Sequence, residues 1–216
     1  MFDYIVFDLD GTLIDTLEGL TVAVNKTMEQ LNLKYHYSKE EVKTFIGRGA
    51  KRLLTLALKR EFSEEEFKLF LHNYEAFQYV SKPFKNVIET LKILNAKNIP
   101  LIIYSNKPDE ILQKLITASL KGINFLYIQG QDLNYPPKPD VTLLNKIIAK
   151  FNLFNKKGLY VGDSIVDIQT ANNANMKCLI LTYGYGKIEE MDKEENKTYI
   201  KDFKEILTYL WLIKKN

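Results

Sequence analysis

The order of apolar and polar residues predicts a layered α/β domain. Five short runs are apolar without polar alternation: 4–7, 100–104, 159–161, 178–181 and, more weakly, 125–128. Such continuous runs are typical of parallel strands that are buried on both faces. Helical patterns with one apolar face lie between the strands, over 86–97, 109–119 and 140–151. The alternation predicts a doubly wound parallel sheet of the Rossmann-like class.

Residues 15–82 interrupt this alternation, because they hold helical patterns and no convincing strand. Helices are expected over about 16–31, 38–46, 50–60 and 63–80. Two of these segments begin with Ser-x-x-Glu, the spacing of a capping box: Ser38 with Glu41 and Ser63 with Glu66. We therefore predict an α/β core domain formed by residues 1–14 and 83–216, with an all-helical domain, 15–82, inserted into it. A final helix is expected over 202–213.

Polar residues follow the predicted strands at the sheet edge where ligands gather in open parallel sheets. In chain order they are Asp8, Asp10, Ser105, Lys138, Asp163 and Asp167. Taken singly, each residue has an ordinary structural explanation, such as capping a helix or facing solvent. Their position after successive strands instead favours one crevice that holds four acids, a hydroxyl and a lysine.

This set of residues suits phosphoryl transfer. A carboxylate such as Asp8 can attack phosphorus and form an acyl-phosphate, which divides one difficult displacement into two easier ones. Asp10 can protonate the leaving oxygen and later deprotonate a water molecule. Carboxylates such as Asp163 are hard oxygen ligands for Mg²⁺. The metal, Ser105 and Lys138 would neutralise charge on the transferring group.

Composition excludes several other classes. The chain of 216 residues is 46% hydrophobic and carries a net charge of only +3, spread as single lysines, so we expect no nucleic-acid partner. Its single cysteine, Cys178, lies in an apolar run and is expected to be buried, and its two histidines lack metal-ligand spacing. Apolar runs are shorter than a membrane span, and the N-terminus is acidic rather than basic. A cytoplasmic protein without a membrane partner is therefore predicted.

Four motifs resemble those of the haloacid dehalogenase-like hydrolase superfamily. They are FDLDGTL (7–13), YSNK (104–107), KPD with Lys138, and VGDSIVD (161–167). The resemblance covers nearly the whole chain. It implies Asp8 as the nucleophile, Asp10 as the acid and base, and Ser105 with Lys138 as phosphoryl contacts. It also implies a Mg²⁺ ion bound by Asp8, the Asp10 backbone carbonyl and Asp163, and supported by Asp167 either directly or through a water molecule.

The helical insertion is similar to the cap of this superfamily. FIGRGAKRLL (45–54) and YGYG (183–186) look like segments of its phosphoglycolate phosphatase branch. The candidate substrate-binding residues are Thr12, Gly47, Arg48 and Asn106. Four positions depart from the usual pattern without removing a catalytic group: Asn86, Ser105, Val141 and Asn175. These departures leave the substrate itself open.

We predict a magnesium-dependent phosphatase that acts on a small anionic phosphomonoester, as a monomer or homodimer. A phosphomutase resembling β-phosphoglucomutase and a pyrophosphatase or nucleotidase remain alternatives on the same fold. A dehalogenase has no use for Asp10, and a non-catalytic binding protein has no need of the complete acid set. The two connections between the domains, 12–18 and 80–85, are the expected hinges.

Overall fold

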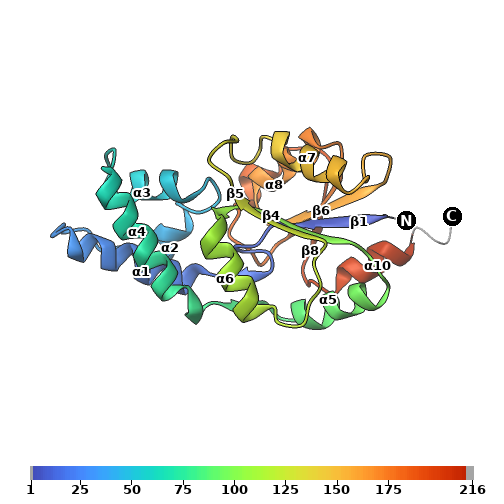
Figure 1. Cartoon of the computed structure of the whole chain (residues 1–216), viewed down its shortest axis with the longest axis horizontal. Helices are drawn as coiled ribbons and strands as arrows, with labels where there is room; N and C mark the ends of the chain where they lie inside the picture. The colour runs from blue at the N-terminus through green and yellow to red at the C-terminus, as the bar shows by residue number, and fades with distance from the viewer. Residues whose placement is uncertain (1, 213–216) are drawn as a thin grey trace.

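A six-stranded parallel sheet forms the centre of the structure, a computed structural model that describes residues 2–212 (Figure 1). Its order is β5-β4-β1-β6-β7-β8. The strands are β1 (Tyr4–Phe7), β4 (Leu101–Pro108), β5 (Tyr127–Gln131), β6 (Gly158–Gly162), β7 (Lys177–Leu181) and β8 (Lys197–Ile200). The chain leaves β1 for β4 on one side and later builds β6 and β7 on the other, so the order reverses between β1 and β6. The predicted doubly wound class is confirmed, and this reversal is where such sheets bind ligands.

Helices cover both faces of the sheet, because the strands carry apolar side chains on both faces. Ile5 and Phe7 of β1 pack in a cluster with α5 (Val87–Ala96), α6 (Asp109–Ser119) and α10 (Glu205–Leu212). Tyr4 and Val6 face the opposite cluster, with α7 (Thr142–Lys150), α8 (Ile165–Asn173) and α9 (Ile188–Met191). Successive strand residues point to opposite faces, so an uninterrupted apolar run fills both layers. Cys178 lies in the second cluster and is buried, as expected.

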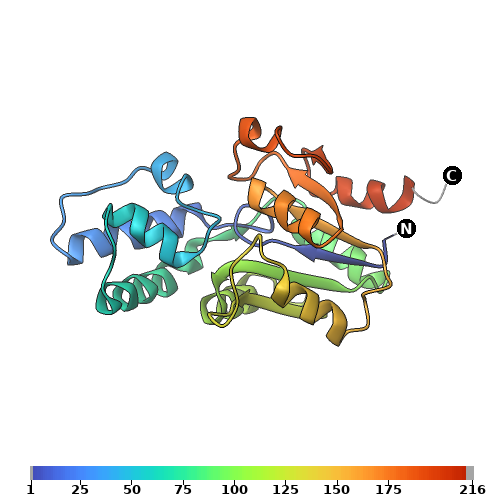
Figure 2. The same ribbon diagram turned by 90° about the horizontal axis from the view of Figure 1, so that it is seen from above.

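Four helices form a separate group at one end of the molecule (Figure 2). They are α1 (Leu17–Gln30), α2 (Lys39–Lys43), α3 (Ala50–Leu58) and α4 (Glu64–Phe77), followed by a 3₁₀ turn, η1 (Gln78–Val80). Both predicted capping boxes are present, at the starts of α2 and α4. The group has its own hydrophobic cluster, which includes Leu54 and Phe70 and to which the core adds Ile111 of α6. We propose that residues 15–82 are a separate domain, called the cap below.

The two connections between the cap and the sheet lie side by side. They form a short antiparallel ribbon of β2 (Ile14–Asp15) and β3 (Lys82–Pro83). Ile14 is fully buried in the cluster under the sheet, which ties the ribbon to the core. The ribbon falls within both predicted hinge segments, and its hinge role stays a prediction.

The structure differs from the predicted elements mainly at the sheet edges. The outer strands β5 and β8 are partly exposed, so neither presents a long apolar run. For this reason β8 was not predicted, and β5 lies at Tyr127–Gln131 rather than 125–128. Strand β4 continues beyond Tyr104 to Pro108, so Ser105 lies inside the strand rather than after it. Residue 213 of the predicted last helix lies outside the described residues.

Candidate active site

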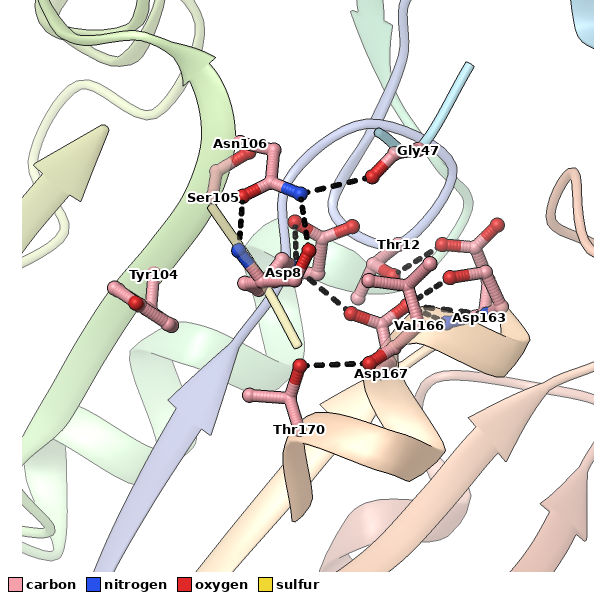
Figure 3. A network of polar contacts seen from close by, with 12 residues as sticks. Asp8, Thr12, Gly47, Tyr104, Ser105, Asn106, Asp163, Val166, Asp167 and Thr170 are labelled. Carbon is pink, nitrogen blue, oxygen red and sulfur yellow. Dashed lines mark hydrogen bonds and ion pairs between the residues drawn. The ribbon is translucent and has the colours of Figure 1, made fainter. Parts of the chain in front are cut away.

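Three aspartate side chains meet at the carboxyl edge of the sheet (Figure 3). Asp8 follows β1, Asp163 follows β6 and Asp167 lies in the first turn of α8, and all three are buried. One carboxylate oxygen from each lies within 4.8 Å of the others. Because β1 and β6 pair directly, residues that are far apart in the sequence become neighbours. The predicted convergence of these acids is therefore present.

These carboxylates fit a divalent metal ion. Burial raises the pKa of Asp8 to about 7, against the opposing effect of Lys138 and with a contribution from Asp167. Burial also raises the pKa of Asp163 well above its ordinary value, and Asp167 and Asp8 act in the same direction. Such shifts report crowded negative charge away from water, which a cation would neutralise. The donors are hard oxygens of the type that Mg²⁺ and Ca²⁺ bind.

Lys138 is the cation that the protein itself places among these acids. Its Nζ lies 2.8 Å from Asp8 Oδ1 and 2.7 Å from Asp167 Oδ1, and it donates a hydrogen bond of 3.2 Å to the Tyr160 hydroxyl. Burial by itself would lower the pKa of Lys138, but Asp167 and Asp8 raise it well above its ordinary value. The ammonium group therefore stays charged beside the predicted nucleophile.

The acid cluster and the two buried lysines beside it carry a negative formal charge when every group is ionised. The acids are Asp8, Asp10, Asp163 and Asp167, and the lysines are Lys107 and Lys138. Four carboxylates against two ammonium groups leave two negative charges, which is the charge that one divalent ion offsets. The charge balance and the donor set thus favour the same kind of ligand.

Two groups from different loops orient the Asp163 carboxylate. The Thr12 hydroxyl donates to Asp163 Oδ1 at 2.8 Å, and the backbone N–H of Tyr185 donates to Oδ2 at 2.6 Å. Gly11 has a φ of +87°, and a Cβ atom there would lie 2.5 Å from Asp163 Oδ2, so only glycine fits. Thr12, a predicted substrate-binding residue, is fully buried and holds Asp163 in the structure, and its contact with substrate stays a prediction.

Ser105 and Asn106 reach the site from the extended end of β4. Ser105 is buried, and its hydroxyl accepts a 3.3 Å hydrogen bond from the backbone N–H of Lys107. The Asn106 side chain accepts from the Lys138 backbone N–H at 2.7 Å and donates to the Lys138 carbonyl at 3.2 Å. It also donates to the carbonyl of Gly47 in the cap, at 3.0 Å. Asn106 therefore positions the Lys138 loop and joins it to the cap, while its predicted contact with substrate stays a prediction.

A cavity of about 260 Å³ lies between the cap and these acids. Asp8, Asp10 and Asp163 line one side, and Gly47 and Arg48 line the cap side; that these two bind substrate stays a prediction. Three further cations line the same cavity and were not predicted: Lys43, Arg52 and Lys187. The cavity thus has an acidic floor and a mainly basic rim, in which Glu190 pairs with Lys187 at 3.5 Å. Arg52 lies in the first turn of α3, whereas Arg48 lies before the helix begins, so no helical spacing in the sequence linked the two arginines.

The two tyrosines of the YGYG segment form hydrogen bonds with the first connection between the core and the cap. The Tyr183 hydroxyl donates to the Thr12 carbonyl at 2.8 Å. The Tyr185 hydroxyl accepts from the backbone N–H of Thr16 at 2.7 Å and donates to Asp15 at the same distance. The segment that orients Asp163 is therefore also attached to the start of the cap.

A family model for the haloacid dehalogenase-like hydrolases matches residues 5–181. The chain belongs to this family. A phosphoglycolate phosphatase from Aquifex aeolicus (strain VF5) is 34% identical over 185 residues, which cover 85% of this chain and 86% of the relative. Another, from Pseudomonas savastanoi pv. phaseolicola (strain 1448A / Race 6), is 29% identical over 212 residues, covering 94% and 78%.

Solved structures agree with this membership. The crystal structure of a predicted phosphoglycolate phosphatase from Haemophilus somnus 129pt aligns with a TM-score of 0.83 and 34% identity, over 97% of this chain and 98% of that chain. The predicted family, its phosphoglycolate phosphatase-like branch and the fold are confirmed. The haloacid dehalogenase-like protein described here is a phosphoric monoester hydrolase.

Two further residues of this hydrolase were not given a role from the sequence. Lys107 follows Asn106 in the YSNK motif, and its Nζ lies 3.4 Å from Asp10 Oδ1. Tyr74 of α4 lies against Lys107, and nothing in its helical pattern indicates a site residue.

Within residues 2–212, no helix is long and apolar enough to cross a membrane.

Proposed function

We propose that this chain is a magnesium-dependent phosphatase that hydrolyses a small anionic phosphomonoester through an aspartyl-phosphate on Asp8. The observation that carries the proposal is the placement of the Asp8 carboxylate, 2.8 Å from Lys138 Nζ and beside Asp163 and Asp167. A carboxylate held next to a fixed cation and a metal-type acid cluster suits attack on a phosphoryl group, whose oxygens need positive charge nearby.

The first half of the reaction forms the intermediate. An Asp8 carboxylate oxygen attacks phosphorus, and the bond between phosphorus and the ester oxygen breaks. Asp10, in its protonated form, gives its proton to the leaving alkoxide, so an alcohol departs and Asp10 becomes a carboxylate. Lys138 and the Ser105 hydroxyl hold the phosphoryl oxygens during the transfer.

The second half releases phosphate. Asp10 takes a proton from a water molecule, the water oxygen attacks phosphorus, and the bond between phosphorus and Asp8 breaks. Inorganic phosphate leaves, Asp8 regains its carboxylate and Asp10 is protonated again. When bound, Mg²⁺ at Asp8, the Asp10 carbonyl, Asp163 and Asp167 supplies charge neutralisation and orientation of the phosphoryl group.

We further propose that the substrate resembles phosphoglycolate. The support is the rim of the cavity, where Lys43, Arg48 and Arg52 suit a second anionic group on the leaving portion, while Lys187 pairs with Glu190 at 3.5 Å. The two relatives described above are phosphoglycolate phosphatases, which agrees with this choice. A cavity of about 260 Å³ also favours a small molecule.

The test is phosphate release with Mg²⁺ from a panel of 2-phosphoglycolate, pyrophosphate, nucleotides and sugar phosphates, the last with a bisphosphate primer. We expect 2-phosphoglycolate to give the highest kcat/KM, and Asp8→Asn to lower kcat by ~10³-fold or more, as loss of a nucleophile does. Glu195→Gln, at an exposed acid away from the cavity, is the control and should behave like the wild type. With ³²P-labelled acetyl phosphate, whose leaving group needs no proton, acid-quenched Asp10→Asn enzyme should retain ³²P on Asp8, because the second half-reaction lacks its base.

Three results would contradict these statements. Undiminished hydrolysis by Asp8→Asn would exclude Asp8 as the nucleophile. Full activity in EDTA would exclude the metal. Isomerisation of a sugar phosphate faster than any phosphate release would replace the phosphatase with a mutase.

A further inference from the structure

A second buried lysine lies in the site and has no part in the steps above. Lys107 belongs to β4, and its side chain is fully buried. Its Nζ lies 3.4 Å from Asp10 Oδ1, the carboxylate proposed as acid and base. On its other side it donates a 2.5 Å hydrogen bond to the hydroxyl of Tyr74. Lys107 therefore connects the acid and base of the core with a residue of the cap.

Burial makes these two contacts necessary. An ammonium group that is removed from water loses several kcal/mol of solvation unless polar or charged partners replace the water. Lys107 is a donor only, so it needs acceptors, and Asp10 and the Tyr74 hydroxyl are the acceptors on its two sides. The Lys107 Nζ also lies 3.9 Å from the centroid of the Tyr74 ring, so loss of the hydroxyl alone removes an acceptor and keeps the ring face.

Tyr74 is carried by the cap rather than by the core. It lies on α4, is buried in the hydrophobic cluster of the cap, and stacks on Phe70 with ring centroids 5.7 Å apart. Burial raises the pKa of Tyr74 well above its ordinary value, so the hydroxyl stays neutral and accepts without adding a negative charge. The contact exists only while α4 lies over the carboxyl edge of the sheet.

A small cavity of about 40 Å³ joins these residues to the reacting groups. Its lining includes Asp8, Asp10, Tyr74, Ser105 and Lys107. The pair of Lys107 and Tyr74 thus borders the same space as the nucleophile. The contact with Lys107 engages one oxygen of Asp10, and a carboxylate has a second oxygen for exchange of the proton.

We propose that Lys107 and Tyr74 are positioning residues that hold the Asp10 carboxylate in place for proton transfer, and that Tyr74 makes this placement depend on the cap. The role rests on the proposed function, because it assumes that Asp10 is the acid and base. It predicts that the pair affects steps that need a proton and leaves other steps nearly unchanged.

Leaving-group dependence tests this role. The two substrates are acetyl phosphate, whose acetate leaves without protonation, and the alkyl phosphate that wild-type enzyme hydrolyses fastest. The ratio kcat/KM reports steps up to departure of the leaving group. We expect kcat/KM for the alkyl phosphate to fall ~10-fold in Tyr74→Phe and ~100-fold in Lys107→Met, a fraction of what proton transfer contributes. For acetyl phosphate we expect changes below about 3-fold by the same reasoning.

Tyr37→Phe is the matched control. Tyr37 is also a buried cap tyrosine, but its hydroxyl donates to the Ala57 carbonyl, away from Asp10. This variant should show the same kcat/KM ratio between substrates as the wild type. In the double variant, Tyr74→Phe should add less than about 2-fold to Lys107→Met, because residues that act through one contact are not additive.

Equal losses on both substrates, a similar effect of Tyr37→Phe, or full additivity would each refute the positioning role. If Lys107→Met does not fold, Tyr74→Phe and Lys107→Arg still decide the question, since each keeps the volume and alters the contact. A wild-type enzyme that hydrolyses neither substrate would refute the proposed function, and this role with it. If the wild type is active but the variants do not lose activity selectively on the alkyl phosphate, only this positioning role is refuted.

Discussion

The core side and the cap side of the site are held in different ways. On the core side Lys138, Asp163 and Asp167 are buried, and each makes several hydrogen bonds or ion pairs. On the cap side Arg48 and Arg52 are exposed and line an open cavity. Buried groups with many partners keep one geometry, whereas exposed side chains can adjust. We infer that the core side determines the chemistry and that the cap side selects the substrate.

The largest expected effect comes from the centre of the core side. In Lys138→Met, two buried carboxylates lose their cation, so we expect kcat to fall by ~10³-fold, in the range for loss of an electrostatic contact to a transition state. The metal-free protein should also lose ~3 kcal/mol of stability, as broken buried ion pairs do. Steady-state kinetics and urea denaturation measure both. Lys92→Met, at an exposed core lysine away from the cavity, is the control, and equal effects of the two variants would contradict the role of Lys138.

A smaller effect is expected when Thr12, which donates a hydrogen bond to the predicted metal ligand Asp163, is replaced. Thr12→Val keeps the shape of the side chain but removes the hydrogen bond to Asp163, so Mg²⁺ affinity should fall ~10-fold, as loss of outer contacts around metal sites does. The measurement is activity against Mg²⁺ concentration. Thr117→Val, on an exposed helix face, is the control. An unchanged Mg²⁺ requirement would show that Thr12 does not act through Asp163.

The acid cluster predicts a pH dependence. The pKa of Asp8 is about 7 in the folded metal-free protein and about 3.9 in an unfolded chain. The folded state therefore binds more protons between these values, and the metal-free protein becomes less stable as pH rises from about 4 to about 7. A proton on Asp8 also competes with the metal, so apparent Mg²⁺ affinity should weaken by about tenfold per pH unit below 7.

Thermal unfolding checks this expectation. The increase in Tm that Mg²⁺ produces over EDTA should be larger at pH 8 than at pH 6. Sodium chloride at matched ionic strength provides the control. An increase in Tm that is independent of pH would mean that the metal does not displace a proton from this cluster.

The smallest effect is expected on the cap side. Arg48→Gln and Arg52→Gln should each raise KM for 2-phosphoglycolate ~10-fold with kcat nearly unchanged, since they remove binding that the ground state and transition state share. Acetyl phosphate, which lacks a second anionic group, should be hydrolysed as before. Lys26→Gln, at a partly exposed cap lysine outside the cavity, controls for net charge. A fall in kcat with unchanged KM would place these arginines in the chemistry instead.

Much of the core side was predictable from local sequence. Parallel strands that are buried on both faces are continuous apolar segments in the sequence, and residues such as Asp8 and Asp163 follow these segments directly. The contacts of Lys107 were not predictable, because they depend on where α4 places Tyr74. The edge strand β8 was missed for a related reason: a half-buried strand lacks the apolar run.

The sequence alone therefore determined the class of sheet, the helical insertion and the acids at the strand ends, since these follow from the period of buried positions and from residue type. Only the tertiary structure decided which of those polar groups meet. In the structure the Thr12 hydroxyl donates to Asp163, and Asn106 joins the Lys138 loop to the cap. Lys107 contacts both Asp10 and Tyr74. The physical reason is that these side-chain contacts join residues on different strands and domains. The distances between such residues are not determined by the local sequence around each of them.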